Sequence, residues 1–130
     1  MKYLGLDWGK RKIGVALADD EVKVASPICV LNNKSVQAAI DQIKELITSE
    51  EIKIIIVGRP TSLKNDTDVS IEYKIFVARL KELGLRVEEV DERLSTKMAI
   101  RLKTQFDLKR KNNDDEVAAA LILQTYLDRP

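Results

Sequence analysis

The spacing of hydrophobic residues along the chain follows two periods, one typical of strands and one of amphipathic helices. Two short runs of strand-forming residues, 3–6 and 13–17, flank a polar connection over residues 7–12 that is short enough for a β-hairpin. Residues 22–31 continue as a third strand, and Pro27 inside it favours an edge position or a bulge. The chain is therefore predicted to open with three consecutive strands.

The middle of the chain alternates between helix and strand patterns. Apolar residues over 36–47 recur every three or four positions after the N-cap former Ser35, which predicts an amphipathic helix. Residues 54–57 are four consecutive β-branched apolar residues, typical of a strand that is buried on both faces of a parallel sheet. A second helix is expected over residues 69–83, with Gly84 as its C-terminal stop.

The last third of the chain continues this alternation. A fifth strand is expected over residues 87–92 and a third helix from about Ser95, while a final helix begins near Asn113 and is apolar on several sides over 117–123. The order βββαβαβα, with one further helix before the last, predicts an α/β fold with a mixed five-stranded sheet and helices on both faces. We find no repeat or linker, so residues 1–130 are expected to form one domain.

The composition narrows the chemistry that this fold can carry out. The chain contains no histidine and one cysteine, Cys29. These counts exclude nucleophilic triads with a histidine base, and zinc sites built from histidine or several cysteines. Any acid–base or metal chemistry must therefore use carboxylates, lysines or tyrosines, and the metal ions that carboxylates prefer are hard cations.

Three acids fall at the ends of predicted elements. Asp7 follows the first strand, Glu92 ends the fifth, and Asp115 lies in the first turn of the final helix, where negative charge is favoured. Ligand sites in α/β sheets lie at the carboxyl ends of parallel strands, so the acids can meet if the first and fifth strands flank the fourth. Crowded carboxylates repel one another, and two bound Mg²⁺ or Mn²⁺ ions would explain why they converge.

Each of these acids also has an ordinary structural interpretation. Asp7 could hydrogen-bond the backbone of its own turn, and Glu92 could be a surface residue of the acidic run 88–92. Asp115 could interact only with the helix dipole, and the neighbouring Asp114 competes with it for any role. The pattern alone leaves these alternatives open.

Basic residues gather near the acids, although the net charge of the chain is only +1. Arg93, Lys97 and Arg101 are spaced to share one helix face. Such a stripe is often only solvated surface, but beside a carboxylate cluster it is also suited to bind a phosphate backbone. The residues that we predict to contact nucleic acid are Lys10, Lys12, Arg59, Arg93, Lys97, Arg101, Lys109, Arg110 and Lys111.

The chain shows no sign of membrane attachment or export. No apolar run approaches the length that spans a bilayer, and the N-terminus lacks the layout of a signal peptide. A single cysteine cannot form an internal disulfide. We therefore expect a cytoplasmic protein without a membrane partner.

Four segments resemble, in the same order, the YqgF/RuvX family. They are LDWGKRKIGVA at 6–16, IIIVGRP at 54–60, DERLST at 91–96 and DEVAAALILQTYL at 115–127. The likeness covers essentially the whole chain and implies an RNase H-like fold related to RuvC. It also implies that Asp7, Glu92 and Asp115, rather than Asp114, are the catalytic acids and metal ligands. Where RuvC-type resolvases carry a fourth acid, this chain has Ala118.

The resemblance implies a metal-dependent endonuclease that acts on structured nucleic acid with Mg²⁺ or Mn²⁺, presumed to be a pair of ions, and leaves 5′-phosphate and 3′-hydroxyl ends. The substrate that it implies is the 5′ end of pre-16S ribosomal RNA, with the small ribosomal subunit as a partner. The alternative is a Holliday junction in DNA recombination and repair. A resolvase needs a dimer to cut two strands symmetrically, and the sequence indicates only a monomer or a weak dimer, so we favour ribosomal RNA.

Two further classes of function compete with a nuclease. An actin-like ATPase closes two such domains over a nucleotide, and 130 residues supply only one. A non-catalytic RNA-binding assembly factor would keep the fold and bind RNA without cutting it. A comparison of the parent with Asp7→Asn separates a nuclease from this factor, because only a nuclease has cutting to lose.

Overall fold

A computed structural model of the chain describes residues 1–59, 71–91 and 114–129. The elements in chain order are β1 (Lys2–Trp8), β2 (Lys12–Asp19), β3 (Ser26–Asn32), α1 (Val36–Glu50), β4 (Ile52–Arg59), α2 (Ile71–Lys81), β5 (Arg86–Asp91) and α4 (Asp114–Leu127). This order agrees with the one that the hydrophobic pattern predicts. The helix expected from about Ser95 lies outside the described residues. Among the helices that are described, none is long and apolar enough to cross a membrane.

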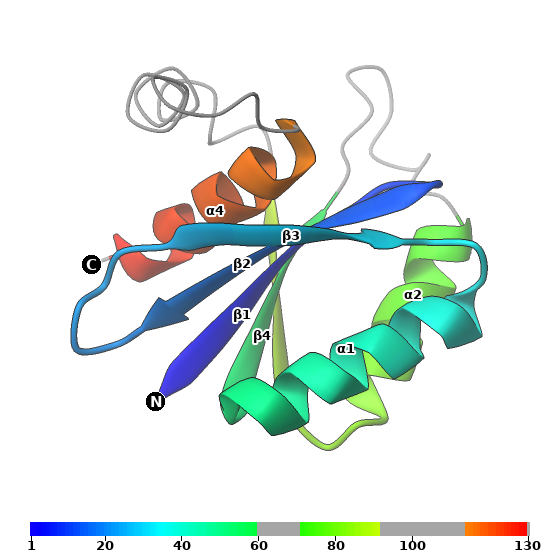
Figure 1. Cartoon of the computed structure of the whole chain (residues 1–130), viewed down its shortest axis with the longest axis horizontal. Helices are drawn as coiled ribbons and strands as arrows, with labels where there is room; N and C mark the ends of the chain where they lie inside the picture. The colour runs from blue at the N-terminus through cyan, green and yellow to red at the C-terminus, as the bar shows by residue number, and fades with distance from the viewer. Residues whose placement is uncertain (60–70, 92–113, 130) are drawn as a thin grey trace.

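The five strands form one mixed sheet in the order β3-β2-β1-β4-β5. β2 runs antiparallel to β1 and β3, whereas β1, β4 and β5 run parallel to one another. Helices α1 and α2 cover one face of the sheet and α4 covers the other (Figure 1). The predicted α/β architecture is confirmed, and β4 lies between β1 and β5, as a meeting of the three acids requires.

Two hydrophobic cores fill the spaces between the sheet and the helices. Side chains of β1 alternate between them, because Leu4, Leu6 and Trp8 pack with α1 and α2, while Tyr3 packs on the α4 side. Residues 54–57 of β4 are all buried, as predicted for a strand that is covered on both faces. The alternation of each strand therefore assigns every residue to one face of the sheet.

The helix boundaries follow the local signals in the sequence. The side chain of Ser35 caps α1, because its Oγ accepts a hydrogen bond from the backbone N–H of Ala38 at 3.1 Å. Gly84 follows α2 with a φ of 85°, a left-handed conformation that glycine adopts without strain, and its N–H donates to the Lys81 carbonyl. Both the predicted cap and the predicted stop are confirmed.

The connection between β1 and β2 is shorter than predicted. Asp7 and Trp8 belong to β1 and Lys12 belongs to β2, which leaves residues 9–11 for the turn. Gly9 permits this tight turn, since a Cβ atom there would lie 2.8 Å from the carbonyl oxygen of Lys12. Asp7 is therefore a strand residue with a neighbour on each side, and the interpretation that places it in the turn is wrong.

The third strand is also shorter than predicted. It begins at Ser26 rather than at residue 22, because residues 20–25 form the turn after β2. Pro27 pairs with Ala16 directly after a register shift, and β3 is an edge strand of the sheet. Both positions that the sequence allowed for this proline, an edge and a local irregularity, are confirmed.

Helix α4 packs unusually close to the sheet at Gly5. A Cβ atom at this position would lie 2.8 Å from the Cβ of Leu123 and 3.0 Å from the carbonyl oxygen of Ala119. The second contact involves the helix backbone, which cannot move aside as a flexible side chain can. Gly5 therefore sets the distance between β1 and α4.

We expect Gly5→Ala to destabilise the protein by about 1–3 kcal/mol, the usual cost of overpacking a filled core. The added methyl group has to push α4 away from β1, because both atoms that it meets belong to that helix. Urea unfolding followed by circular dichroism measures the change in the free energy of unfolding. An unchanged or higher unfolding midpoint would contradict the close packing of α4 on Gly5.

Candidate active site

Asp7 lies near the carboxyl end of β1 and points to the α4 face of the sheet. This assignment follows from strand alternation, because Leu6 and Trp8 on either side of it pack in the core with α1 and α2. Its neighbours in the sheet are Gly14 of β2 and Gly58 of β4. Neither neighbour has a side chain, so no side chain of β2 or β4 lies directly beside Asp7 in the sheet.

Helix α4 runs antiparallel to β1, with its first turn toward Asp7. Tyr126 near the end of α4 contacts Tyr3 near the start of β1, with ring centroids 6.0 Å apart. The middle of α4 lies against Gly5. From Gly5 to Asp7 the strand advances about 7 Å, which corresponds to roughly four or five residues of helix. Four or five residues before Ala119, in the middle of α4, lies the first turn of this helix, which is therefore level with Asp7.

Asp115 is the second residue of α4, so its backbone belongs to this first turn. The third predicted acid, Glu92, lies outside the described residues and directly follows Asp91, the last residue of β5. Within the described part of the chain, no group of three potential ligands that could hold a metal ion is found. The fold thus brings Asp7 and the position of Asp115 to the same end of the same face.

The end of β1 is anchored from the opposite face of the sheet. Trp8 packs edge-on against Tyr73 of α2, with ring centroids 5.7 Å apart. The hydroxyl of Tyr73 donates a hydrogen bond to Oε1 of Glu89 on β5 at 2.7 Å. Tyr73 therefore connects the carboxyl ends of β1 and β5, which holds the backbone of Asp7 in place relative to β5.

The single cysteine does not extend the set of possible ligands. Cys29 lies half-buried on β3, and burial raises the pKa of its thiol above the ordinary value. The carboxylate of Glu116 raises this pKa further. Both effects disfavour the thiolate, which is the form that metal ligation needs.

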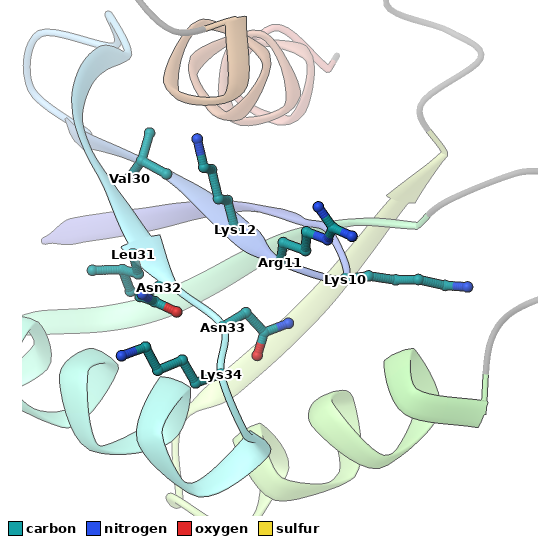
Figure 2. A pocket seen from close by; sticks show the side chains of 8 residues that line it. All are labelled: Lys10, Arg11, Lys12, Val30, Leu31, Asn32, Asn33 and Lys34. Atoms are coloured by element: carbon teal, nitrogen blue, oxygen red, sulfur yellow. The ribbon is translucent and has the colours of Figure 1, made fainter.

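The predicted nucleic-acid contacts divide into three groups. Lys10 and Lys12 are exposed at the β1–β2 hairpin, and Lys12 points to the α4 face, as Asp7 does (Figure 2). Arg59 is the last residue of β4 and lines a cavity of about 380 Å³ with Tyr73 and Lys81, on the face opposite Asp7. The predicted contacts that lie outside the described residues are Arg93, Lys97, Arg101, Lys109, Arg110 and Lys111.

A groove beside the hairpin contains functional candidates that sequence reasoning missed. We call it the hairpin groove; it has a volume of about 590 Å³ and is lined by Lys10, Arg11, Lys12, Val30, Leu31, Asn32, Asn33 and Lys34 (Figure 2). Arg11 and Lys34 were not among the predicted contacts. Lys34 is far from the hairpin along the chain, and only the pairing of β2 with β3 brings it there. The three consecutive strands that the pattern predicts are compatible with this pairing, but the pattern does not predict a groove beside it.

Comparisons with known proteins give three consistent findings. A family model described as RuvX: Holliday junction resolvase matches residues 1–129. A protein of Streptococcus pneumoniae (strain Hungary19A-6), which carries the provisional name pre-16S rRNA nuclease, is 38% identical over 137 residues, with 99% of each chain covered. Among solved structures, T. thermophilus RuvC in complex with Holliday junction substrate has a TM-score of 0.68 at 16% identity, covering 98% of this chain and 93% of that one.

A more distant structure shares the same fold. The large terminase nuclease from thermophilic phage G20c, solved with bound magnesium, has a TM-score of 0.60 at 10% identity. The match covers 96% of this chain and 80% of the phage protein. Together with RuvC, this similarity shows that the chain has the RuvC-like, RNase H-type fold.

Proposed function

Because the chain belongs to the RuvX family and is a nuclease, we propose that it hydrolyses phosphodiester bonds with divalent metal ions held at the carboxyl ends of β1, β4 and β5. The observation that carries this proposal is the position of Asp7. Its carboxylate lies on the α4 face between two glycines, and the first turn of α4 extends toward it.

The other two acids complete the proposed set of ligands. Asp115 belongs to the first turn of α4. Val90 of β5 packs on the α4 side of the sheet and pairs with Gly58, the neighbour of Asp7. Since strand side chains alternate with a period of two, a continuation of β5 by two residues from Val90 would give Glu92 the same face as Asp7.

The residues available fit Mg²⁺ or Mn²⁺ better than any softer metal. The chain offers no histidine, and burial raises the pKa of its one cysteine, Cys29 on β3, which disfavours the thiolate. Carboxylate oxygens are therefore the ligands at hand, and hard cations prefer them. The same fold in the phage terminase nuclease is solved with bound magnesium. When bound, such ions lower the pKa of an attacking water and stabilise the charge on a phosphate and its leaving oxygen.

In this proposal, some residues of the chain bind the metal ions and others bind the phosphates of the substrate. Asp7, Glu92 and Asp115 hold two ions, while Lys10 and Lys12 contact phosphates beside the cleavage point. Arg59 faces α2, so we leave it out of the set near the phosphate that is cut. The residues proposed to hold the backbone further away are Arg93, Lys97, Arg101, Lys109, Arg110 and Lys111.

The substrate that we propose is the 5′ end of pre-16S ribosomal RNA, within or near the small ribosomal subunit. The name of the 38% identical streptococcal relative supports this substrate. A Holliday junction is the second candidate, because the description of the family model names it. Ala118 argues against the junction, since the resolvases that this chain resembles carry a fourth acid at that position.

A direct comparison of the two substrates tests the proposal. Purified protein receives, in parallel with Mn²⁺ present, a pre-16S RNA fragment spanning the mature 5′ end and a four-way DNA junction. We expect cleavage of the RNA at or near the mature end, with a 5′-phosphate on the product, and little cleavage of the junction. Sequencing gels that resolve the product ends provide the measurement.

The other outcomes identify the competing functions. Paired, symmetric cuts in the junction together with intact RNA would establish a resolvase instead. Binding of the RNA without cleavage, also in the presence of small-subunit particles, would indicate a non-catalytic assembly factor. The variant Asp7→Asn serves as the blank for contaminating nucleases in every reaction.

A further inference from the structure

The hairpin groove is held in shape by hydrogen bonds across its floor. The backbone N–H of Asn33 donates to the carbonyl of Arg11 at 2.9 Å, and its side-chain amide donates to the carbonyl of Gly9 at 2.7 Å. From the other side, the side-chain amide of Gln42 donates to the carbonyl of Asn32 at 2.9 Å. These bonds fix the end of β3 against the β1–β2 turn, so the groove exists before any ligand binds.

Among the described residues that line this groove, four carry a positive charge and none is acidic. They are Lys10, Arg11, Lys12 and Lys34. None of the four forms an ion pair with another described residue, whereas Lys2, Arg79 and Arg86 elsewhere on the surface each pair with a glutamate. The described part of the chain therefore leaves this positive charge uncompensated, and an anion is the ligand that such a potential attracts.

The chemistry of the lining favours a phosphate backbone over a base or a nucleotide. None of the described residues that line the groove is aromatic, so they offer no platform on which a base could stack. Lysine and arginine side chains from two separate turns instead offer donors spread along its length, as a chain of phosphates requires. Figure 2 shows Lys12 on the α4 side and Lys34 on the α1 side of this row.

The groove lies close to the end of β1 that carries Asp7. Lys12 lies two residues before Gly14 on β2, and Gly14 pairs directly with Asp7. Two residues of a strand span about 7 Å, so a strand of nucleic acid that leaves the cleavage point reaches Lys12 within a short step. Lys34 then lies further along the same groove.

From these observations, and resting on the proposed function, we propose that the hairpin groove binds the sugar–phosphate backbone of the RNA strand on one side of the cleavage point. Arg11 and Lys34 are the new phosphate contacts. Asn33 is a positioning residue that holds the two basic turns together.

Replacement of Lys34 tests this binding site without touching the acids. Binding of a short single-stranded RNA to wild type, Lys34→Gln and Lys53→Gln is measured by fluorescence anisotropy at several salt concentrations, with chelator present. Lys53 is also an exposed lysine and lies near the amino end of β4, and its replacement is the matched control. Equal thermal unfolding midpoints confirm that all three proteins fold alike.

We expect Lys34→Gln to weaken RNA binding about threefold to fivefold, as for the loss of one exposed ion pair. The slope of log K against log salt should fall in magnitude by roughly 0.7, the value for one phosphate contact on a single strand. Lys53→Gln should change neither quantity. A DNA strand of the same sequence distinguishes the source of the contact: an equal loss indicates phosphate alone, and a larger loss with RNA than with DNA adds a ribose contact in the groove.

Two outcomes would overturn the proposal that the hairpin groove binds the RNA backbone. One is an unchanged affinity and salt slope for Lys34→Gln relative to Lys53→Gln. The other is displacement of RNA by an acidic peptide that binds more tightly through Lys34, which would make the groove a protein-docking site. The assay measures binding and needs no cleavage. A protein that binds RNA through Lys34 but never cuts it would therefore contradict only the proposed nuclease mechanism. A protein that cuts RNA but binds it equally well after Lys34→Gln would contradict only the proposed role of the hairpin groove.

Discussion

Asp7→Asn is expected to lower the rate of RNA cleavage by more than about 100-fold, because even residues that only support a metal ligand typically contribute about 10- to 100-fold. The substitution keeps the size of the side chain but removes the charge that we propose holds the metal ions. Binding of RNA should stay within about twofold of the wild-type value, since the groove cations are unchanged. Single-turnover cleavage and anisotropy, measured on the same preparation, separate the two effects.

Asp41→Asn is the matched control for this experiment. Asp41 lies exposed on α1, where its carboxylate accepts a hydrogen bond from Gln37, far along the chain from β1. The same chemical change there should leave cleavage at the wild-type rate. Cleavage by Asp7→Asn at more than about a tenth of the wild-type rate would show that Asp7 is not a metal ligand in the reaction.

Removal of divalent metal ions is expected to abolish cleavage completely, and Mg²⁺ or Mn²⁺ should restore it. The reason is that, in the proposed mechanism, the bound ions activate the attacking water and stabilise the charge on the phosphate. Titration of each ion into chelator-treated protein, with gel-based cleavage as the readout, measures the dependence. Cleavage that persists in excess chelator would reject the metal mechanism.

A second measurement makes the metal site visible without any substrate. Binding to the folded state alone stabilises a protein by about 2.7 kcal/mol when the ligand is present at 100 times its dissociation constant. Mn²⁺ should therefore raise the thermal unfolding midpoint of the wild type and of Asp41→Asn. It should not raise that of Asp7→Asn. An equal rise in all three would place the ion away from β1.

The order and type of the described elements could be predicted because each depends on local physical signals. The β-branched run 54–57 needs apolar surroundings on both sides, and Ser35 and Gly84 mark helix ends through their own hydrogen bonds and conformation. The length of the β1–β2 turn could not be predicted. The polar residues 7–12 were all predicted to belong to the connection, whereas Asp7 and Lys12 are paired strand residues at the end of the sheet.

The candidate site could be predicted only in part, for a similar reason. The position of Asp7 at a strand end is visible in the sequence, and the strand order that places β4 beside it is confirmed. The face that each residue occupies depends on register, so Arg59 was grouped with residues from which the sheet separates it. The hairpin groove depends on a contact between segments that are distant along the chain, and such contacts leave no local pattern.

The close packing of α4 on Gly5 has a consequence for folding during protein synthesis. α4 is the last described helix to leave the ribosome, and until it emerges the sheet lacks both its cover on one face and the segment that bears Asp115. The proposed set of acids therefore stays incomplete until α4 has packed on the sheet.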